Sequence, residues 1–295
     1  MDDVLLPGFL PSEQDLIDKA LATPLDKKIV RAIALIREYE KKALELSSDG
    51  YYLAFSGGKD SIVIKQLAIE AGVRFMPWYN TTTIDPPELI YYMRQHHPDV
   101  KWNSAQKSFF KALEDTPPPT IWTRWCCSRY KEQGGRGLFK VVGVRIVESS
   151  RRAKLWQEFA QKMGSFYLAP ICYWTDADVW NFIHSRNLPY CKLYDEGFKR
   201  LGCVGCPLAG DDNKRKQFER WPRYEMFWKP GVRKYFDLRR GTMSKKTGKA
   251  LFVNRFQSFE EYWQWWMDGA DKGTKQLCAY EEQFLGIAGT SEGEE

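Results

Sequence analysis

The sequence lacks several features that would place it in a common class of protein. It has no run of 18 apolar residues, which excludes an ordinary membrane-spanning helix and argues against a membrane partner. Its first residues are acidic and soon interrupted by Pro7, unlike a secretory signal peptide, so we expect a cytoplasmic protein. It also has no internal repeat and no phosphate loop with the spacing G-x-x-x-x-G-K-[ST].

The length and composition suit an ordinary globular protein. The 295 residues are 43% hydrophobic and 28% charged, as expected for one medium domain with appendages or for two small domains. Seven cysteines in a chain expected in the cytosol favour thiolate or metal chemistry over disulfides. The net charge of +6 is spread unevenly. The cysteines and the basic residues are therefore the first candidates for function.

The most informative stretch is an apolar run that ends in a glycine-rich turn. A strand-forming run at residues 51–55 leads into Ser-Gly-Gly-Lys-Asp-Ser at 56–61, and a helix-periodic apolar segment follows. Backbone N–H groups and the positive end of the helix dipole then meet in one small volume, which suits an anion. Gly57 and Gly58 permit close approach of a phosphate, and Lys59 adds a positive charge. The alternative is an ordinary tight turn whose polar side chains cap the helix.

Strands and helices alternate along the chain. Predicted strands cover residues 51–55, 73–79, 139–145 and 167–173, and a further short strand ends at Trp102. Predicted helices cover residues 11–23, 25–48, 61–71, 86–95, 104–113, 153–162, 176–186 and 259–266, with a broken helix at 214–240. This order predicts an α/β protein with a mainly parallel, twisted sheet flanked by helices, an N-terminal helical arm and a C-terminal helical region.

Four cysteines form a second group of candidates. Cys126 and Cys127 are adjacent, and Cys203 and Cys206 form a C-x-x-C pair. Two such pairs can supply four thiolates to one metal centre. Tetrahedral zinc and a redox-active dithiol at the C-x-x-C pair are the alternatives. The other three cysteines, Cys172, Cys191 and Cys278, have no partner pattern and are expected to be buried apolar residues.

These motifs together resemble a known family. The turn at 56–61 is similar to the pyrophosphate-binding loop of the N-type ATP pyrophosphatases, which have an adenine nucleotide α-hydrolase-like fold. The run from residue 50 to 210, with its C-C and C-x-x-C pairs, resembles the phosphoadenosine-phosphosulfate (PAPS) reductase family. The resemblance implies an adenine nucleotide at the carboxyl edge of the sheet. It also implies a [4Fe–4S] cluster on Cys126, Cys127, Cys203 and Cys206, with zinc as the alternative.

The resemblance assigns further residues to the nucleotide site. The segment Gly143–Arg152 resembles a family motif in which Arg145, Arg151 and Arg152 hold phosphate or sulfate by forked donation and Glu148 orients an arginine. A solvated, charge-rich helix start is the alternative. The implied nucleotide-binding set is Ser56, Gly57, Gly58, Lys59, Asp60, Ser61, Asp85 and Glu148, where Asp85 helps hold nucleotide or Mg²⁺. The implied catalytic set is Lys59, Asp60, Arg145 and Arg152.

Two departures from the reductases point to a different reaction. The reductases usually lack the lysine of the loop and carry a terminal Glu-Cys-Gly-Leu-His segment, whereas this sequence has Lys59 and no such segment. Retaining the lysine suits adenylate transfer from Mg²⁺-bound ATP with release of pyrophosphate. The combination is most similar to the iron–sulfur ATP pyrophosphatases of DNA phosphorothioation, which implies a sulfur donor such as a cysteine desulfurase. A PAPS or adenylyl-sulfate reductase and a non-catalytic nucleotide-binding or nucleic-acid-binding module are the alternatives.

The last third of the chain is basic and aromatic. Residues 214–249 hold 13 Lys or Arg against three acidic residues, an excess of +10 that favours a DNA or RNA partner. The rings either stack on bases or pack a helical subdomain, and packing explains them better. We expect four segments: a helical arm at 1–48, a nucleotide-binding domain at 49–210, a basic, aromatic helical region at 211–288 and a disordered tail at 289–295. The oligomeric state cannot be predicted from these patterns.

Overall fold

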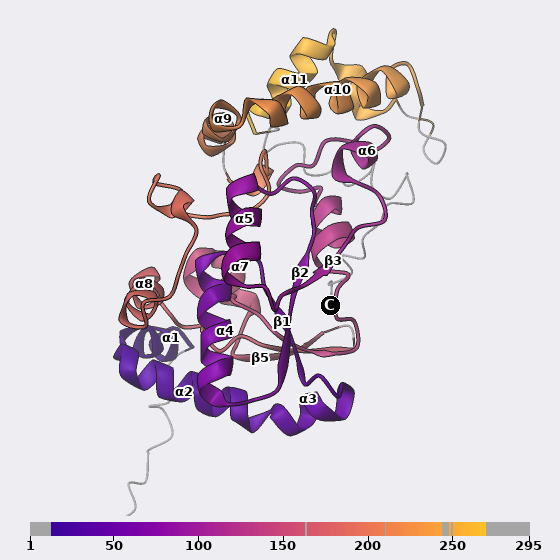
Figure 1. Ribbon diagram of the computed structural model, residues 1–295. Coiled ribbons are helices and arrows are strands. Elements are labelled where there is room, and N and C mark those ends of the chain that lie inside the picture. Colours follow the sequence, from indigo (N-terminus) through magenta and orange to yellow (C-terminus); the bar gives the residue numbers. More distant parts are fainter. Residues whose placement is uncertain (1–12, 163, 210, 244–247, 249, 270–295) are drawn as a thin grey trace, which may run out of the picture. The chain divides into compact units, whose positions relative to one another are not determined.

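The computed structural model describes residues 13–162, 164–209, 211–243, 248 and 250–269 (Figure 1). The chain forms two compact units that alternate along the sequence. The first unit comprises Met1–Tyr79, His96–Lys101 and Gly135–Cys191, and the second comprises Asn80–Gln95, Trp102–Gly134 and Lys192–Glu295. The four segments expected from the sequence stay a prediction. Cys278 and the acidic tail lie outside the described residues.

A six-stranded sheet has the order β3-β2-β1-β4-β6-β5. Its strands are β1 (Tyr51–Ala54), β2 (Phe75–Asn80), β3 (Lys101–Asn103), β4 (Phe139–Val141), β5 (Phe159–Lys162) and β6 (Ser165–Leu168). Strand β1 is parallel to β2 and β4, β4 is parallel to β6, and β5 is antiparallel to β6. The predicted α/β fold with a mainly parallel sheet is confirmed.

Helices of the first unit pack around these strands. They are α1 (Glu13–Ala22), α2 (Leu25–Glu38), α3 (Glu40–Leu46), α4 (Lys59–Ala71), α7 (Ser150–Leu155) and α8 (Asp176–Ser185). Helix α4 is buried along most of its length, packs against α2 and α8, and is followed by Gly72 in the left-handed conformation. The fully buried Tyr51 of β1 donates a hydrogen bond of 2.7 Å to the carbonyl of Ile36. The N-terminal helices are therefore fixed to the central strand.

The second unit is mainly helical. It contains α5 (Pro87–His96, of which His96 belongs to the first unit), α6 (Phe109–Leu113), α9 (Asp211–Arg220), α10 (Pro222–Arg239), α11 (Phe259–Met267) and a π-helical turn at Cys127–Lys131. Trp228 of α10 stacks on Trp266 of α11 at a centroid distance of 4.6 Å, and both rings are fully buried. The indole of Trp266 donates to the carbonyl of Pro119 at 2.8 Å. Aromatic packing therefore holds the helices of this unit together.

The structure corrects several expected elements. The helix expected at 153–162 is wrong, because α7 ends at Leu155 and residues 159–162 form β5. Phe159 stacks on Tyr39 at 4.9 Å, and β5 pairs with β6, so tertiary packing overrides the local helical pattern. The helix expected at 25–48 is interrupted at Tyr39, and the strand expected at 167–173 ends at Leu168. Within the described residues, no helix is long and apolar enough to cross a membrane.

The core of the first unit contains a histidine that should make stability depend on pH. His97 is 8% exposed, its ring packs edge-on against Phe55 at 4.7 Å, and its Nδ1 lies 3.2 Å from Nζ of Lys65. Burial and the Lys65 charge lower the pKa of His97 to about 4. The unfolded chain takes up this proton near pH 6.5, whereas the folded chain does so only near pH 4.

We predict that the free energy of unfolding falls as the pH drops from about 6.5 to about 4, by about 3 kcal/mol from this residue. Urea unfolding at a series of pH values measures it. The variant His97→Gln should lose this part of the pH dependence, whereas His184→Gln, at an exposed histidine, should retain it. Equal pH profiles for wild type and His97→Gln would contradict the assignment.

Candidate functional site

The turn between β1 and α4 forms the first candidate site. Gly57 has φ of +73°, a conformation that favours glycine, and Gly58 is the residue before the helix. The helix begins at Lys59, earlier than expected, so Lys59, Asp60 and Ser61 form its first turn. The hydroxyl of Ser61 donates to the carbonyl of Gly58 at 2.7 Å. The first turn of α4 therefore directs its N–H groups and dipole toward the loop.

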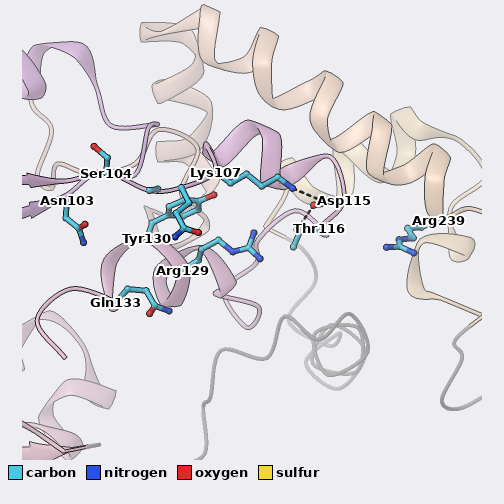
Figure 2. A pocket seen from close by; sticks show the side chains of 11 residues that line it. Asn103, Ser104, Lys107, Asp115, Thr116, Arg129, Tyr130, Gln133 and Arg239 are labelled. Carbon is cyan, nitrogen blue, oxygen red and sulfur yellow. Dashed lines mark hydrogen bonds and ion pairs between the residues drawn. The ribbon is translucent and has the colours of Figure 1, made fainter. Parts of the chain in front are cut away.

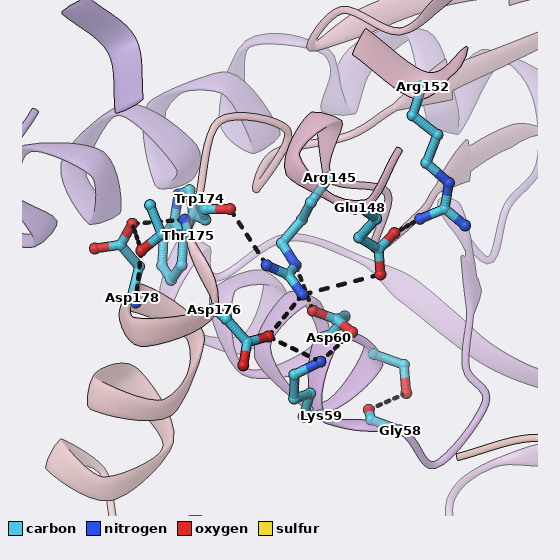
Figure 3. A network of polar contacts seen from close by, with 11 residues as sticks. Gly58, Lys59, Asp60, Arg145, Glu148, Arg152, Trp174, Thr175, Asp176 and Asp178 are labelled. Carbon is cyan, nitrogen blue, oxygen red and sulfur yellow. Dashed lines mark hydrogen bonds and ion pairs between the residues drawn. The ribbon is translucent and has the colours of Figure 1, made fainter. Parts of the chain in front are cut away.

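A network of charged side chains surrounds the start of α4 (Figure 3). Nζ of Lys59 lies 3.3 Å from Oδ2 of Asp60 and 3.2 Å from Oδ1 of Asp176. The guanidinium of Arg145 donates to Asp60 at 2.7 Å and to Asp176 at 3.0 Å. Lys59 and Arg145 are 4% and 2% exposed, so both cations are buried against carboxylates. These ion pairs fix the side chains of three chain segments in one place.

The segment after β4 approaches the helix closely. A Cβ at Gly143 would lie 3.1 Å from the backbone carbon of Asp60, so glycine permits this contact. Farther along, Arg152 forms an ion pair with Glu148, and Glu148 lies 3.9 Å from the guanidinium of Arg145 (Figure 3). The structure therefore brings Arg145, Glu148 and Arg152 together near the loop, as expected if Glu148 orients an arginine. The side chain of Arg151 lies outside what the structure describes.

Sequence reasoning missed Asp176, the carboxylate shared by Lys59 and Arg145. It is the first residue of α8, whose start carries a capping box formed by Thr175 and Asp178. Its own side chain is 64% exposed, so solvent and ligands can reach it. A phosphate that entered here would compete with Asp176 for the two cations. In the sequence, only the cluster of acidic residues at the start of a predicted helix could have indicated Asp176.

The four predicted cysteine ligands belong to the second unit, where they line one cavity. The remaining walls are mostly apolar and include Phe109, Pro207 and Trp228. The cavity has a volume of about 20 Å³, which is room for about one water molecule. The structure therefore brings together all four cysteines that the sequence predicted as a group. Two others, Cys172 and Cys191, are buried as expected.

The C-x-x-C loop is held by specific contacts. The N–H of Val204 donates to the carbonyl of Ile84 at 2.8 Å, and the indole of Trp228 donates to the carbonyl of Val204 at 3.1 Å. The N–H of Gly205 donates to the side chain of Gln217 at 2.8 Å. Gly205 has φ of +79°, and a Cβ there would lie 2.8 Å from the Trp228 nitrogen. Helices α9 and α10 therefore determine the shape of the loop.

The thiols at this cavity do not all have the same pKa. The hydrogen bond from Cys126 and, more weakly, the positive charges of Lys131 and Arg124 outweigh burial and lower the pKa of Cys127 to about 5. Burial raises the pKa of Cys203 to about 12, against an opposing effect of Lys131. The negative charge of Cys203 in turn raises the pKa of Lys131. Lys131 is therefore a cation that lies beside the thiols. Sequence reasoning missed it, although its position four residues after Cys127 could have indicated it.

Asp85 also belongs to the second unit. It is 7% exposed and accepts a hydrogen bond of 2.7 Å from the hydroxyl of Thr82, and its negative charge raises the pKa of Lys131. Its backbone carbonyl accepts from the hydroxyl of Tyr224 at 2.7 Å. These contacts place Asp85 beside the charged groups of the cysteine cavity. Its role in holding nucleotide or Mg²⁺ stays a prediction.

The side chains at the cysteine cavity are of the type that binds metal centres. Four thiols suit iron–sulfur or zinc. Among the described residues, no three His, Cys, Asp or Glu side chains lie close enough to hold one metal ion. A four-iron cluster takes one thiolate on each iron, so its ligands stand farther apart than those around a single zinc ion. Because the cavity is small, the side chains would have to separate to admit a cluster.

A larger, basic cavity of about 550 Å³ opens on the same loop. Cys203 and Cys206 line it, together with four basic residues and one acidic residue, Lys131, Lys199, Arg200, Lys216 and Glu196. An anionic molecule can therefore approach these cysteines from this side.

The basic C-terminal region is less available than its sequence predicts. Lys214 is fully buried, and its ammonium donates to the carbonyl of Trp266 at 2.5 Å, at the end of α11. Arg220, Arg233 and Lys234 form ion pairs with glutamates. Most rings of the region are buried, including Phe218, Trp221, Trp228, Tyr235 and Phe236, so they pack rather than stack on bases. Residues 244–247 and 249 lie outside the described part of the chain.

Comparison with known proteins identifies the family. A family model described as the phosphoadenosine phosphosulfate reductase domain matches residues 50–209. An uncharacterised protein of Methanocaldococcus jannaschii is 29% identical over 221 residues, which are 69% of this chain and 50% of that protein. An adenosine 5'-phosphosulfate reductase of Staphylococcus haemolyticus is 25% identical over 148 residues, 47% of this chain and 61% of that enzyme. A crystal structure of phosphoadenylyl-sulfate reductase from Candida auris, a phosphate complex, has a TM-score of 0.44 at 16% identity and covers 67% of this chain and 98% of that one.

The family match covers more than half of the sequence, so the chain belongs to the family of the phosphoadenosine phosphosulfate reductase domain. The resemblance found in the sequence is confirmed at this level. The chain spans about half the length of its archaeal relative. Its place in the DNA-phosphorothioation group stays a prediction.

Gly205 offers a test of the cysteine loop. The variant Gly205→Ala should lower the free energy of unfolding by about 2–4 kcal/mol, because it adds both backbone strain and a clash with Trp228. Gly241→Ala is the matched control, since Gly241 has φ of +77° and open space around its Cα. It should cost about 1 kcal/mol from strain alone. Urea unfolding measures both, and equal losses would refute the described packing.

Proposed function

We propose that this chain is an ATP pyrophosphatase that adenylates an acceptor in a sulfur-transfer reaction, with a nucleic acid as the acceptor. One observation carries the proposal: a buried lysine, Lys59, lies in the first turn of a helix that follows a glycine turn, held by carboxylates that Arg145 positions. The family membership agrees with a nucleotide substrate.

The charged network explains how a triphosphate would bind. The β- and γ-phosphates occupy the turn from Ser56 to Ser61, where the N–H groups and the dipole of α4 attract negative charge. Lys59 exchanges its contact with Asp176 for a phosphate oxygen. Asp60 and Asp176 would hold Mg²⁺ through their carboxylate oxygens, and this ion would neutralise phosphate charge when bound. Arg145 stays buried, so it acts by positioning Asp60 and Asp176.

The chemical step is displacement at the α-phosphorus. An acceptor oxygen attacks this atom, the bond from the α-phosphorus to its bridging oxygen breaks, and pyrophosphate leaves with the bonding electrons. Lys59 stabilises the charge that develops on the leaving group, and Arg152, released from Glu148, contacts the transferring phosphoryl group. The acceptor is left adenylated at the attacking oxygen.

Sulfur then replaces the adenylate. A persulfide on a partner such as a cysteine desulfurase attacks the activated acceptor through its terminal sulfur, and AMP leaves with the oxygen. A second thiol releases the product from the resulting disulfide and is oxidised in turn. The basic cavity beside Cys203 and Cys206 suits an anionic acceptor at this stage.

The cysteine cavity would hold an iron–sulfur cluster through Cys126, Cys127, Cys203 and Cys206. Such a cluster supplies electron-transfer or sulfur-carrying chemistry when bound. Lys131 places a positive charge beside the thiols and favours their deprotonated form.

A reductase acting on adenylyl sulfate or PAPS is the second candidate, because a relative 25% identical to this chain bears the name adenosine 5'-phosphosulfate reductase. That reaction releases sulfite and AMP, or sulfite and adenosine 3',5'-bisphosphate from PAPS, and takes two electrons from a thiol donor. Sulfite release from adenylyl sulfate or PAPS with a thiol donor, and no pyrophosphate from ATP, would favour the reductase.

The central lysine can be tested by substitution. The variant Lys59→Met should slow pyrophosphate release from ATP by about 100-fold or more, because the leaving group loses its positive partner. A coupled pyrophosphate assay, run with a nucleic-acid acceptor and a persulfide donor, measures the rate. Lys65→Met is the matched control, since Lys65 is also buried on α4 and paired with a carboxylate, Asp99.

The control should keep most of the wild-type rate after its stability is taken into account. Equal rates for wild type and Lys59→Met would remove the proposed role of the lysine. Binding of ATP without any pyrophosphate would instead favour a non-catalytic nucleotide-binding module.

The metal centre has its own test. Protein purified without oxygen should contain about four irons and acid-labile sulfide per chain. Serine at any of the four cavity cysteines should lower the iron content, whereas Cys172→Ala, at a buried cysteine outside the cavity, should not. Metal analysis and the visible absorption spectrum report the result. About one zinc per chain and no colour would contradict the iron–sulfur assignment.

A further inference from the structure

The second unit contains another cavity, with a volume of about 730 Å³, which shares Tyr130 of the π-helical turn with the cysteine cavity (Figure 2). It is lined by the segment Asn103–Lys107, by Asp115 and Thr116, by Arg129 and Tyr130 of the turn, by Gln133 beyond it, and by Arg239 at the end of α10. Its size suits a nucleotide-sized ligand, and its walls are mostly polar. Of these residues only Arg239 belongs to a segment, residues 214–249, for which the sequence suggested a nucleic-acid partner.

The cavity is positively charged. Its lining has three basic residues, Lys107, Arg129 and Arg239, against one acidic residue, Asp115. Lys107 pairs with Asp115 at 2.9 Å, which neutralises both charges (Figure 2). Two guanidiniums therefore remain to attract an anion, and guanidiniums suit phosphate because they donate two parallel hydrogen bonds.

Two buried polar atoms in the cavity walls lack hydrogen bonds. Nε of Arg239 and the hydroxyl of Tyr130 have no hydrogen-bond partner among the described residues. Tyr130 is 5% exposed, and the guanidinium of the neighbouring Arg129 lies close to its hydroxyl. Buried polar groups are usually paired, so each of these two side chains keeps a donor that the described residues do not use. Both belong to residues that line this cavity.

The position of Tyr130 relates this cavity to the proposed reaction. Its side chain lines both this cavity and the cysteine cavity. A molecule bound here would therefore lie one aromatic ring away from the thiols. At the rim, the exposed amides of Gln106 and Gln133 can pair with the edge of a nucleobase.

We infer that this cavity binds a phosphate-bearing nucleotide unit of the acceptor nucleic acid. Arg129 and Arg239 contact the phosphate, the hydroxyl of Tyr130 pairs with the sugar or phosphate, and the rim amides contact the base. The inference rests on the proposed function, because it supplies the acceptor of that reaction. A free nucleotide shares this chemistry and is the other source of ligand.

The experiment measures binding without ATP, on the full chain purified without oxygen. Fluorescence anisotropy follows short single-stranded DNA and RNA oligonucleotides, and competition with AMP tests the free nucleotide. The variants Arg129→Gln and Arg239→Gln should each weaken oligonucleotide binding by about tenfold, since each removes a charge-assisted contact. Each should also reduce the slope of log binding constant against log salt concentration, by the amount expected for the loss of about one phosphate contact.

Arg223→Gln is the matched control, because it removes the same charge from an exposed position on α10 outside the cavity lining. It should weaken binding by less than about twofold. Thermal unfolding checks that Arg129→Gln, which removes a cation stacked on Trp125, still folds. If Arg129→Gln does not fold, the binding measurement with Arg239→Gln decides the test.

The outcomes separate this inference from the proposed function. Selective loss of oligonucleotide binding in the cavity variants supports a nucleic-acid ligand, and selective loss of AMP binding supports a free nucleotide. If both cavity variants bind both ligands as Arg223→Gln does, the inference is overturned even when ATP yields pyrophosphate. If ATP yields no pyrophosphate but the cavity variants still lose oligonucleotide binding, the proposed function fails and the cavity remains a nucleotide site.

Discussion

The guanidinium of Arg145 is buried, and a buried positive charge is stable only where carboxylates or carbonyls surround it. Here Asp60, Asp176 and the carbonyl of Trp174 supply those partners. They come from the starts of α4 and α8, so one side chain fixes the two helix ends that border the glycine turn. The same contacts leave Lys59 with carboxylates that a phosphate can replace. The first candidate site is therefore a set of ion pairs that, in the proposed function, exchange partners when a phosphate binds.

Aromatic packing positions the candidate site of the second unit, whereas ion pairs position the candidate site of the first unit. Trp228 both stacks on Trp266 and donates to the C-x-x-C loop, so the aromatic core and the cysteine cavity share a residue. This explains why a chain rich in basic residues after position 213 buries so many of its rings. It also explains why Lys214 is unavailable to a nucleic acid, since its ammonium caps α11. The cations that face cavities, such as Arg239, are a small part of the basic sequence.

The sequence predicted the parts that depend on local chemistry. A strand, two glycines and a helix start define the turn at 56–61. The two cysteine pairs predict a group of four thiols, and this prediction needs no knowledge of the rest of the fold. It did not predict partners brought together by the fold, such as Asp176 for Lys59 or Lys131 for Cys203. It also failed at β5, where pairing with β6 and stacking on Tyr39 override a helical pattern. Long-range contacts leave little trace in a single sequence.

The central claim is that a triphosphate displaces carboxylates from Lys59 at the start of α4. A crystal structure of the protein with Mg²⁺ and an ATP analogue carrying a methylene group between the α- and β-phosphorus atoms tests it most directly. We expect a β- or γ-phosphate oxygen within about 3 Å of Nζ of Lys59, with Asp176 no longer in contact with that nitrogen and Arg145 still paired with Asp60 and Asp176. An analogue bound elsewhere, with Lys59 still held by Asp60 and Asp176, would contradict the account.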